Sequence, residues 1–404
     1  MLGPRSRLPN EIVVANKRNL YGMLALGCAG MVGLAACGGG DGSSGPAQGT
    51  LQVSMTDAPA CGFDHVYVTV SKIRVNGNPN VDDNGSGWVD IPVTPVRRID
   101  LLSLTNGVMA TLGKAALPAG DYQQIRLVLQ ANGGRPYANA VVQTGSGGEE
   151  IALTTPSAAQ SGYKIIRPFT VAPDTLTDLV LDFDACKSIV ARGNGGFNLK
   201  PVVTAIPMVV SGRIQGYAPA GSYVYAERGG EVVKGTVATD AGSFTLSPIE
   251  QSRTAGNVDV VVVPPPAAAR AAGIIRAVPV VAGASTTVST AAAPINPPSS
   301  AVNTVTGTVT PASAEAALRA LQTTGGARFE IASTFANLST GAYSMRLPAA
   351  APAVGTYQTT LPIPLAQDAA AAGRYTIEAI NATGAVQSAS VDVGAGPATR
   401  DFAF

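Results

Sequence analysis

Apolar and polar residues alternate in short runs over most of residues 50–207, as they do in strands with one buried face. Residues 65–75, HVYVTVSKIRV, contain such a run, but its phase changes near Ser71. One additional residue there predicts a β-bulge that keeps the apolar set on a single face of the sheet. This set consists of Val66, Val68, Val70, Ile73 and Val75.

Two more segments in this part have the same period of two: QQIRLVL at residues 123–129 and DLVLDFD at residues 178–184. Each predicts a strand with one buried face. Glycine-rich segments between the runs predict turns, and LLSLTNG at residues 101–107 predicts a short helical turn. In the last strand, alternation places three acids on the face opposite the apolar residues, namely Asp178, Asp182 and Asp184.

A different pattern begins after residue 207. The segment YVYAERGGEVV predicts a β-hairpin with Gly229 and Gly230 at its turn, and TDAGSFTL follows it. Farther along the chain, VTGTVTP and STGAYSMRL repeat this arrangement. Two related modules are therefore predicted, joined by a Pro- and Ala-rich linker at residues 291–300.

Composition agrees with strands rather than long helices. Charged residues make up 13% of the 404 residues, while 46 Gly and 29 Pro are spread throughout, which suits short strands joined by tight turns. Lys and Arg number 27 against 26 Asp and Glu; beyond the first 36 positions they number 23 against 25, a formal charge of −2. This balance lacks the basic surface that nucleic acids require, so we expect no nucleic-acid partner.

The beginning of the chain has the anatomy of an export signal. A basic segment, residues 1–19, precedes an uncharged apolar run, residues 20–36. The sequence LAAC, which ends at Cys37, resembles the lipobox of bacterial lipoproteins, and this resemblance implies cleavage before Cys37 and lipidation of its thiol. Residues 37–49 then form a flexible tether, in which Gly38 resembles the signal for transfer to the outer membrane of Gram-negative bacteria.

Several separate motifs within residues 50–207 resemble one family, in the expected order. They are LQVSMTDAPACGFDHVYVTVSKIRV, RRIDLLSLTNG, LPAGDYQQIRLVL and DLVLDFDACKSIVARGNGGFNLKPVV, and the family is the bacterial lipoprotein module known as domain of unknown function 4382. The resemblance implies no activity, because the family is defined by sequence. Residues 208–290 and 301–404 are similar to carboxypeptidase regulatory-like, prealbumin-type β-sandwiches, since each contains G-x-[VI] followed by a segment of the type T-[DT]-x-G-x-[FY]-x-[LM], from which the second copy departs by lacking the Asp.

The sequence therefore predicts an all-β chain of three tandem β-sandwich modules, Ig- or prealbumin-like, behind a cleaved lipoprotein signal and a flexible tether. A rod of three modules on a lipid anchor is the arrangement that we expect. The predicted parts are the signal at 1–36, the lipidated cysteine and tether at 37–49, the first module at 50–207, the second at 208–290, the linker at 291–300 and the third at 301–404.

The four cysteines have different expected roles. Cys28 lies within the discarded signal and follows a poorer lipobox than Cys37 does. Cys61 and Cys186 are then the thiols of the exported chain, and oxidising conditions favour disulfides. We expect these two to pair; two separately buried thiols are the alternative.

Acidic residues offer a possible metal site. A disulfide between Cys61 and Cys186 draws Asp57 towards Asp182 and Asp184, and carboxylate oxygens suit calcium. A solvated polar face, or carboxylates that cap loop amides, is the alternative. No other cofactor is expected, because one His and two paired cysteines leave too few ligands for a zinc site.

Aromatic residues and the single histidine complete the candidates. Tyr223 and Tyr225 share one face of the predicted hairpin, a placement that suits stacking on sugar rings. Packing in a core is the alternative, because prealbumin-like sandwiches bury such residues. His65 is expected on the exposed face of its strand, and the sequence provides no clear nucleophile or second base to make it catalytic.

Together these features predict a protein that is not an enzyme, a lipid-anchored binding or structural module of the cell envelope. We expect it at the outer membrane of a Gram-negative bacterium, on the periplasmic side or the cell surface. Its expected partners are the membrane, through the lipid anchor, and a glycan or another envelope protein. A glycan-binding accessory protein and a fimbria-like surface assembly subunit are the alternatives.

Overall fold

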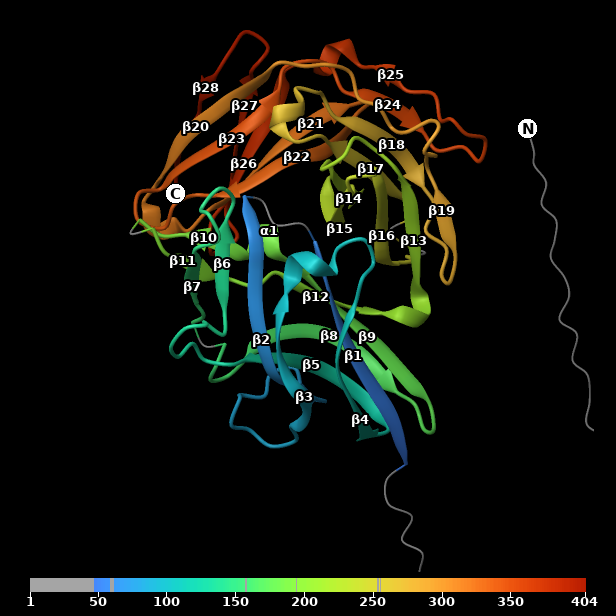
Figure 1. The fold of residues 1–404 in the computed structure, drawn as a ribbon, viewed down its shortest axis with the longest axis vertical. Coiled ribbons are helices and arrows are strands. Elements are labelled where there is room, and N and C mark those ends of the chain that lie inside the picture. The colour runs from blue at the N-terminus through green and yellow to red at the C-terminus, as the bar shows by residue number, and fades with distance from the viewer. Residues whose placement is uncertain (1–46, 59–61, 157, 194, 253, 255) are drawn as a thin grey trace, which may run out of the picture. The chain divides into compact units, whose positions relative to one another are not determined.

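The structure is a computed structural model, and it describes residues 47–58, 62–156, 158–193, 195–252, 254 and 256–404. Nearly all of the regular secondary structure in this part of the chain is β-strand, arranged in six sheets, so the all-β prediction is confirmed (Figure 1). None of its helices is long and apolar enough to cross a membrane. The predicted export signal, Cys37 and most of the tether lie outside the described residues.

The first region, residues 48–207, consists of two sheets around one hydrophobic core. One sheet has the strand order β12 (Val203–Pro207), β9 (Leu176–Asp184), β1 (Gln48–Ala58) and β4 (Ala110–Pro118). The other runs β10 (Ile189–Ala191), β11 (Phe197–Leu199), β7 (Glu150–Thr154), β6 (Ala140–Gln143), β2 (Phe63–Asn76), β5 (Gly120–Leu129) and β8 (Tyr163–Val171), with β3 (Val89–Asp100) beside β2.

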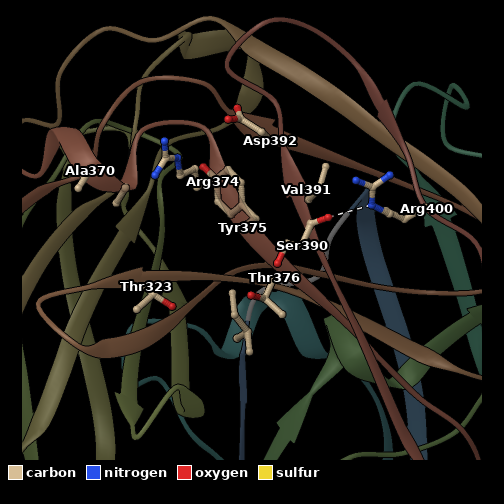
Figure 2. A pocket seen from close by; sticks show the side chains of 11 residues that line it. Thr323, Ala370, Arg374, Tyr375, Thr376, Ser390, Val391, Asp392 and Arg400 are labelled. Atoms are coloured by element: carbon tan, nitrogen blue, oxygen red, sulfur yellow. Dashed lines mark hydrogen bonds between the residues drawn. The ribbon is translucent and has the colours of Figure 1, made fainter.

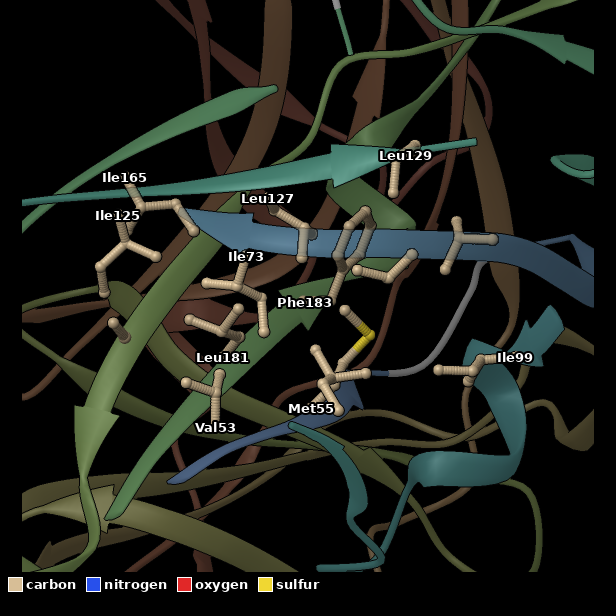
Figure 3. Close-up of a cluster of buried hydrophobic side chains, with 14 of the residues drawn as sticks. Val53, Met55, Ile73, Ile99, Ile125, Leu127, Leu129, Ile165, Leu181 and Phe183 are labelled. Atoms are coloured by element: carbon tan, nitrogen blue, oxygen red, sulfur yellow. The ribbon is translucent and has the colours of Figure 1, made fainter. Parts of the chain in front are cut away.

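The bulge predicted in β2 is confirmed. The register of β2 against both β3 and β5 shifts between Val70 and Lys72, and the apolar residues before and after the shift belong to the same core. Figure 3 shows Ile73, which follows the shift, within this core. The short helical turn is also present, as the 3₁₀ helix η1 (Leu101–Leu104). All five apolar residues of the predicted set are 0% exposed: Val66, Val68, Val70, Ile73 and Val75.

The second and third regions repeat one topology. In the second, β13 (Ser211–Tyr217) lies between β16 (Ser243–Glu250) and β19 (Ser285–Thr287), and the facing sheet runs β15 (Glu231–Val237), β14 (Tyr223–Arg228), β17 (Val258–Val263) and β18 (Gly273–Val278). In the third, β20 (Val302–Thr310) lies between β23 (Ala342–Pro348) and β28 (Ala398–Thr399) and also pairs with β29 (Phe402–Ala403); the facing sheet runs β22 (Ala327–Phe335), β21 (Ala317–Thr324), β26 (Arg374–Ile380) and β27 (Val386–Asp392).

The glycine of each G-x-[VI] motif makes room for a parallel neighbour strand. A Cβ atom added at Gly212 would lie 2.3 Å from the carbonyl oxygen of Val281, just before β19. One added at Gly307 would lie 1.6 Å from the carbonyl oxygen of Arg400, just after β28. The repeated sequence motif thus corresponds to a repeated close approach of the backbone.

The sheet of β14, β17 and β18 is buried on both faces. In β17, VDVVVV, Val260 and Val262 face the core of the second region, whereas Val261 faces the core of the third region. Two further strands, β24 (Ala353–Thr356) and β25 (Ala366–Gln367), extend this sheet beyond β18 although they come from the range predicted for the third module. The two regions therefore share a layer rather than standing apart.

The first region contacts both of the others. Arg167 forms an ion pair with Glu250 of the second region, at 2.6 Å, and Lys187 forms one with Glu330 of the third, at 3.0 Å. The expected rod is therefore wrong, because the first and third modules of a rod do not touch. The predicted linker is also held along its length: Arg270 donates hydrogen bonds to Asn296 and to the carbonyl oxygen of Pro297.

Candidate functional site

The three aspartates proposed from the sequence come together at the carboxyl ends of β1 and β9. These strands are parallel, and their register places Thr56 opposite Asp182 and Ala58 opposite Asp184. Asp57 is fully buried, and the charges of both Asp182 and Asp184 act on it. A solvated polar face, one of the two alternatives to a metal site, is therefore wrong for Asp182, because strand β15 of the second region covers it together with Asp57. A turn or cap role is the expectation that the sequence favours for Asp57.

A lysine that the sequence analysis missed completes this cluster. Nζ of Lys234, in β15, lies 2.5 Å from Oδ1 of Asp182 and donates a further hydrogen bond to the carbonyl oxygen of Asp57 at 3.4 Å. The lysine side chain is 1% exposed and that of Asp182 is 8% exposed. The only sequence signal was a lysine that follows two valines within the strand EVVKGTV, residues 231–237.

Two of the aspartates hold the start of helix α1 (Ala185–Ser188). Oδ1 of Asp57 accepts a hydrogen bond from the backbone N–H of Ala185 at 3.1 Å, and Oδ1 of Asp184 accepts one from Lys187 at 2.9 Å. These are the capping contacts of the alternative interpretation. Oδ2 of Asp57 is buried and has no hydrogen-bond partner among the residues that the structure describes.

Burial changes the proton affinity of these acids. Loss of solvent raises the pKa of Asp184 to about 6, against the opposing effect of Lys187. It also raises the pKa of Asp57 well above its usual value, and the neighbouring Asp184 adds to that rise. The pKa of Asp182 is raised by burial as well, although Lys234 acts in the opposite direction.

The cluster continues into the third region. Lys187 forms its ion pair with Glu330, and the backbone N–H of Glu330 donates to Oε2 of Glu227 at 3.0 Å. Glu227 is 0% exposed, and burial raises its pKa well above the usual value. Its Oε1 has no hydrogen-bond partner in the described part of the chain. We call this set the charge junction: Asp57, Asp182, Asp184, Lys187, Glu227, Lys234 and Glu330.

The charge junction has the chemistry of a structural site. Among the residues that the structure describes, no group of three or more His, Cys, Asp or Glu is arranged to hold a metal ion. The cation beside Asp182 is the ammonium group of Lys234. Calcium at Asp57, Asp182 and Asp184 stays a prediction.

The two tyrosines lie where the second and third regions meet. Their rings are nearly parallel, at 3°, with centroids 6.4 Å apart. Tyr225 packs against the hydrophobic core of the third region, and burial raises its pKa well above the usual value. Both tyrosines line a cavity of about 100 Å³ together with Arg270 and the exposed Arg346. Tyr225 thus has a packing role, whatever the cavity binds.

His65 is exposed, as predicted. Its Nδ1 atom lies 2.7 Å from Oδ2 of Asp100, and its ring stacks on Tyr67. Oδ1 of Asp100 accepts hydrogen bonds from the backbone N–H groups of Val66 and Leu102. The pair therefore fixes the end of β3 against β2.

The predicted cysteine roles stay predictions. Cys37 and Cys61 lie outside the described residues. Cys186 lies in α1, directly before Lys187 of the charge junction.

Comparison with known families supports the resemblance of the first region. Residues 48–201 match the family model described as "Domain of unknown function (DUF4382)", close to the range 50–207 expected from the sequence. A search of the curated proteins found no match.

Solved structures share only weak likeness with this chain. A streptococcal ancillary pilin has 8% identity and a TM-score of 0.16, covering 88% of this chain and 98% of its own. BcpA, the major pilin subunit of Bacillus cereus, has 9% identity and a TM-score of 0.13, covering 88% and 99%. A tetra-tandem repeat from the extending region of a large adhesion protein has 10% identity and a TM-score of 0.11, covering 84% and 73%.

Proposed function

We propose that the chain is a non-catalytic protein of the bacterial cell envelope, held at the outer membrane by a lipid on Cys37 and acting as a rigid scaffold. The support for the anchor is the LAAC sequence that ends at Cys37, at the end of an apolar segment and before a Gly- and Ser-rich tether. Two or more acyl chains are needed for stable anchoring, and a lipoprotein-type cysteine carries them.

The scaffold role is supported mainly by the hydrogen bonds and the ion pair that the buried acids form. The best candidates for reactive groups, Asp57, Asp182 and Asp184, bond to Lys234 or to the amides of α1. An active site needs a group that can reach a substrate, whereas Asp57 and Asp182 are covered by the second region. Buried charges that join regions favour one fixed arrangement of the sheets, which suits a spacer or a platform.

The anchor is tested by labelling intact cells with a fatty-acid analogue. Wild-type protein is expected to incorporate the label and to fractionate with the outer membrane, and Cys37→Ser is expected to lose both properties. Cys28→Ser is the matched control and keeps them. Label retained in Cys37→Ser contradicts the assignment. Protease treatment of the same cells distinguishes the surface from the periplasmic side, and higher-order oligomers of delipidated protein favour a fimbria-like assembly instead.

A second candidate function, glycan binding, is favoured by the cavity at the tyrosines. Tyr223 is half-buried there, and Arg346 has no hydrogen bond or ion pair within the described part of the chain. An aromatic face beside a free guanidinium suits a sugar ring. Binding on a glycan array that is lost in Tyr223→Ala supports this function, and binding that survives the substitution contradicts it. The control is Tyr137→Ala, because Tyr137 lines a different cavity.

A further inference from the structure

A second cavity, much larger than the one at the tyrosines, lies in the third region. It has a volume of about 510 Å³ and lies over strands β21, β26 and β27, bordered by Ala370 of the 3₁₀ helix η5 (Ala369–Ala371) and by Arg400 (Figure 2). Its size suits one or two sugar units rather than a solvent molecule. Neither the matched family nor the scaffold role assigns anything to it.

Strand register explains why this face is hollow. Thr376 of β26 pairs with Ser390 of β27 on one side and with Leu321 of β21 on the other. The two short hydroxyl side chains form a low floor, while arginines stand at its ends. Figure 2 shows Arg374 and Arg400 on opposite sides of this floor.

Both arginines are available to a ligand. Within the described residues, the side chain of Arg374 makes no hydrogen bond or ion pair, and it is exposed. Arg400 donates from Nε to the carbonyl oxygen of Ser390 and from Nη1 to that of Thr399, both at 2.9 Å, so its guanidinium is held in place while Nη2 stays unused. A guanidinium that is already oriented loses little entropy when it binds an anion.

Charge limits the class of ligand. Asp392, paired in register with Arg374, also lines the cavity, and its Oδ1 accepts a hydrogen bond from Gly394. Two arginines and one aspartate leave a net charge of +1, which suits a single carboxylate better than a doubly charged phosphate. The hydroxyls of Thr323, Thr376 and Ser390 have no partner within the described residues and match a hydroxyl-rich ligand.

We propose that this cavity binds a carboxylate-bearing saccharide, with the uronate group held between Arg374 and Arg400 and the sugar hydroxyls bonded to the threonine and serine floor. The ring of Tyr375 is in the core and its hydroxyl donates to the carbonyl oxygen of Pro348, so binding relies on charge and hydrogen bonds rather than on ring stacking. The proposal depends neither on the lipid anchor nor on the tyrosine cavity.

The test is calorimetric titration of the detergent-solubilised full chain with tetragalacturonate, beside a neutral galactose tetrasaccharide. The acidic sugar is expected to bind and the neutral one to bind at least ten-fold more weakly. Binding of the acidic sugar is expected to weaken as NaCl rises from 50 to 500 mM, because the contact is partly exposed. No binding of tetragalacturonate, or equal binding of both sugars, overturns the proposal.

Variants then locate the site. Arg374→Ala is expected to weaken binding at least ten-fold. The affinity of Arg374→Lys is expected to lie between those of Arg374→Ala and the wild type, because lysine keeps the positive charge but cannot form the bidentate hydrogen bonds of a guanidinium group. Arg213→Ala removes an equally exposed arginine of β13 and is expected to change nothing. Arg374 has no partner to lose, so folding is retained. An Arg374→Ala affinity equal to that of Arg213→Ala overturns the assignment.

Discussion

Nζ of Lys234 lies 2.5 Å from Oδ1 of Asp182, although the two residues come from different sheets and are 52 positions apart. The side chains are 1% and 8% exposed. Each charge is therefore balanced mainly by the other, since water has little access to either. Removing one partner leaves a buried charge without compensation, whereas removing both does not.

Lys234→Met is expected to lower the free energy of unfolding by about 3 to 5 kcal/mol, because Asp182 stays buried without its cation. The double variant with Asp182→Leu is expected to recover most of the loss. Urea unfolding followed by the fluorescence of Trp88 measures both. Lys164→Met, at an exposed position of β8, is the control. A loss in Lys234→Met no larger than in the control contradicts a structural role for the pair.

Glu227→Gln is expected to flatten the dependence of stability on pH. Burial raises the folded-state pKa of Glu227, so its contribution is complete below the unfolded value of about 4.3 and is lost as pH rises through the folded value. Asp184, with a folded pKa of about 6, acts in the same direction. Unfolding free energies from pH 4.5 to 8 should therefore fall more steeply for wild type than for Glu227→Gln. The exposed Glu149→Gln should run parallel to wild type; a parallel curve for Glu227→Gln refutes the prediction.

Asn106→Gly isolates the side-chain contacts that dock the first region on the second. The side chain donates to the carbonyl oxygen of Val237 and accepts from Thr236 and Thr245, at 2.9 to 3.1 Å. Because φ of Asn106 is 57°, glycine fits there without strain. Losing three bonds of about 1 kcal/mol each predicts a loss of about 3 kcal/mol in unfolding free energy. Asp174→Gly, at φ 54° and exposed, should be neutral or slightly stabilising; equal effects contradict this account.

The cysteine pairing is tested by peptide mapping without reduction. A linked peptide that contains both Cys61 and Cys186 is expected from protein exported into an oxidising compartment. Reduction should then lower the unfolding free energy by roughly 4 to 5 kcal/mol, since the closed loop is long. Alkylation of both thiols in unreduced protein would instead support two separate buried cysteines.

If the three aspartates act only as caps and as the partner of Lys234, calcium is expected to leave the melting temperature unchanged. Lys234 already compensates the charge of Asp182, and the oxygens of Asp57 and Asp184 accept hydrogen bonds from α1. Thermal melts in 5 mM CaCl₂ and in EDTA are the comparison. A melting temperature that rises with calcium in the wild type but not in Asp182→Asn would instead support the predicted metal site.

The sequence correctly predicted the features that depend on residues close together in the chain. Alternation located the strands, and the phase change near Ser71 located the bulge in β2. Alternation could not predict that Asp182 is buried, because it only divides a strand into two faces. The covering strand β15 comes much later in the chain, and its Lys234 is 52 positions from Asp182. For the same reason Lys234 was overlooked, since its partner is visible only in three dimensions. Nor did the pattern show that β24 extends a sheet of the second region.

Because the second and third regions share a sheet, the second region stays incompletely covered until the third region is present. Val261, Ala272 and Ile274 face a core whose other buried residues lie at position 305 or later. A nascent or partly exported chain that ends before those residues presents an apolar surface with nothing to cover it, and such surfaces bind chaperones or aggregate. The last hundred residues therefore act as an intramolecular cover, and nonsense or frameshift changes within them should leave an insoluble product rather than a shorter working protein.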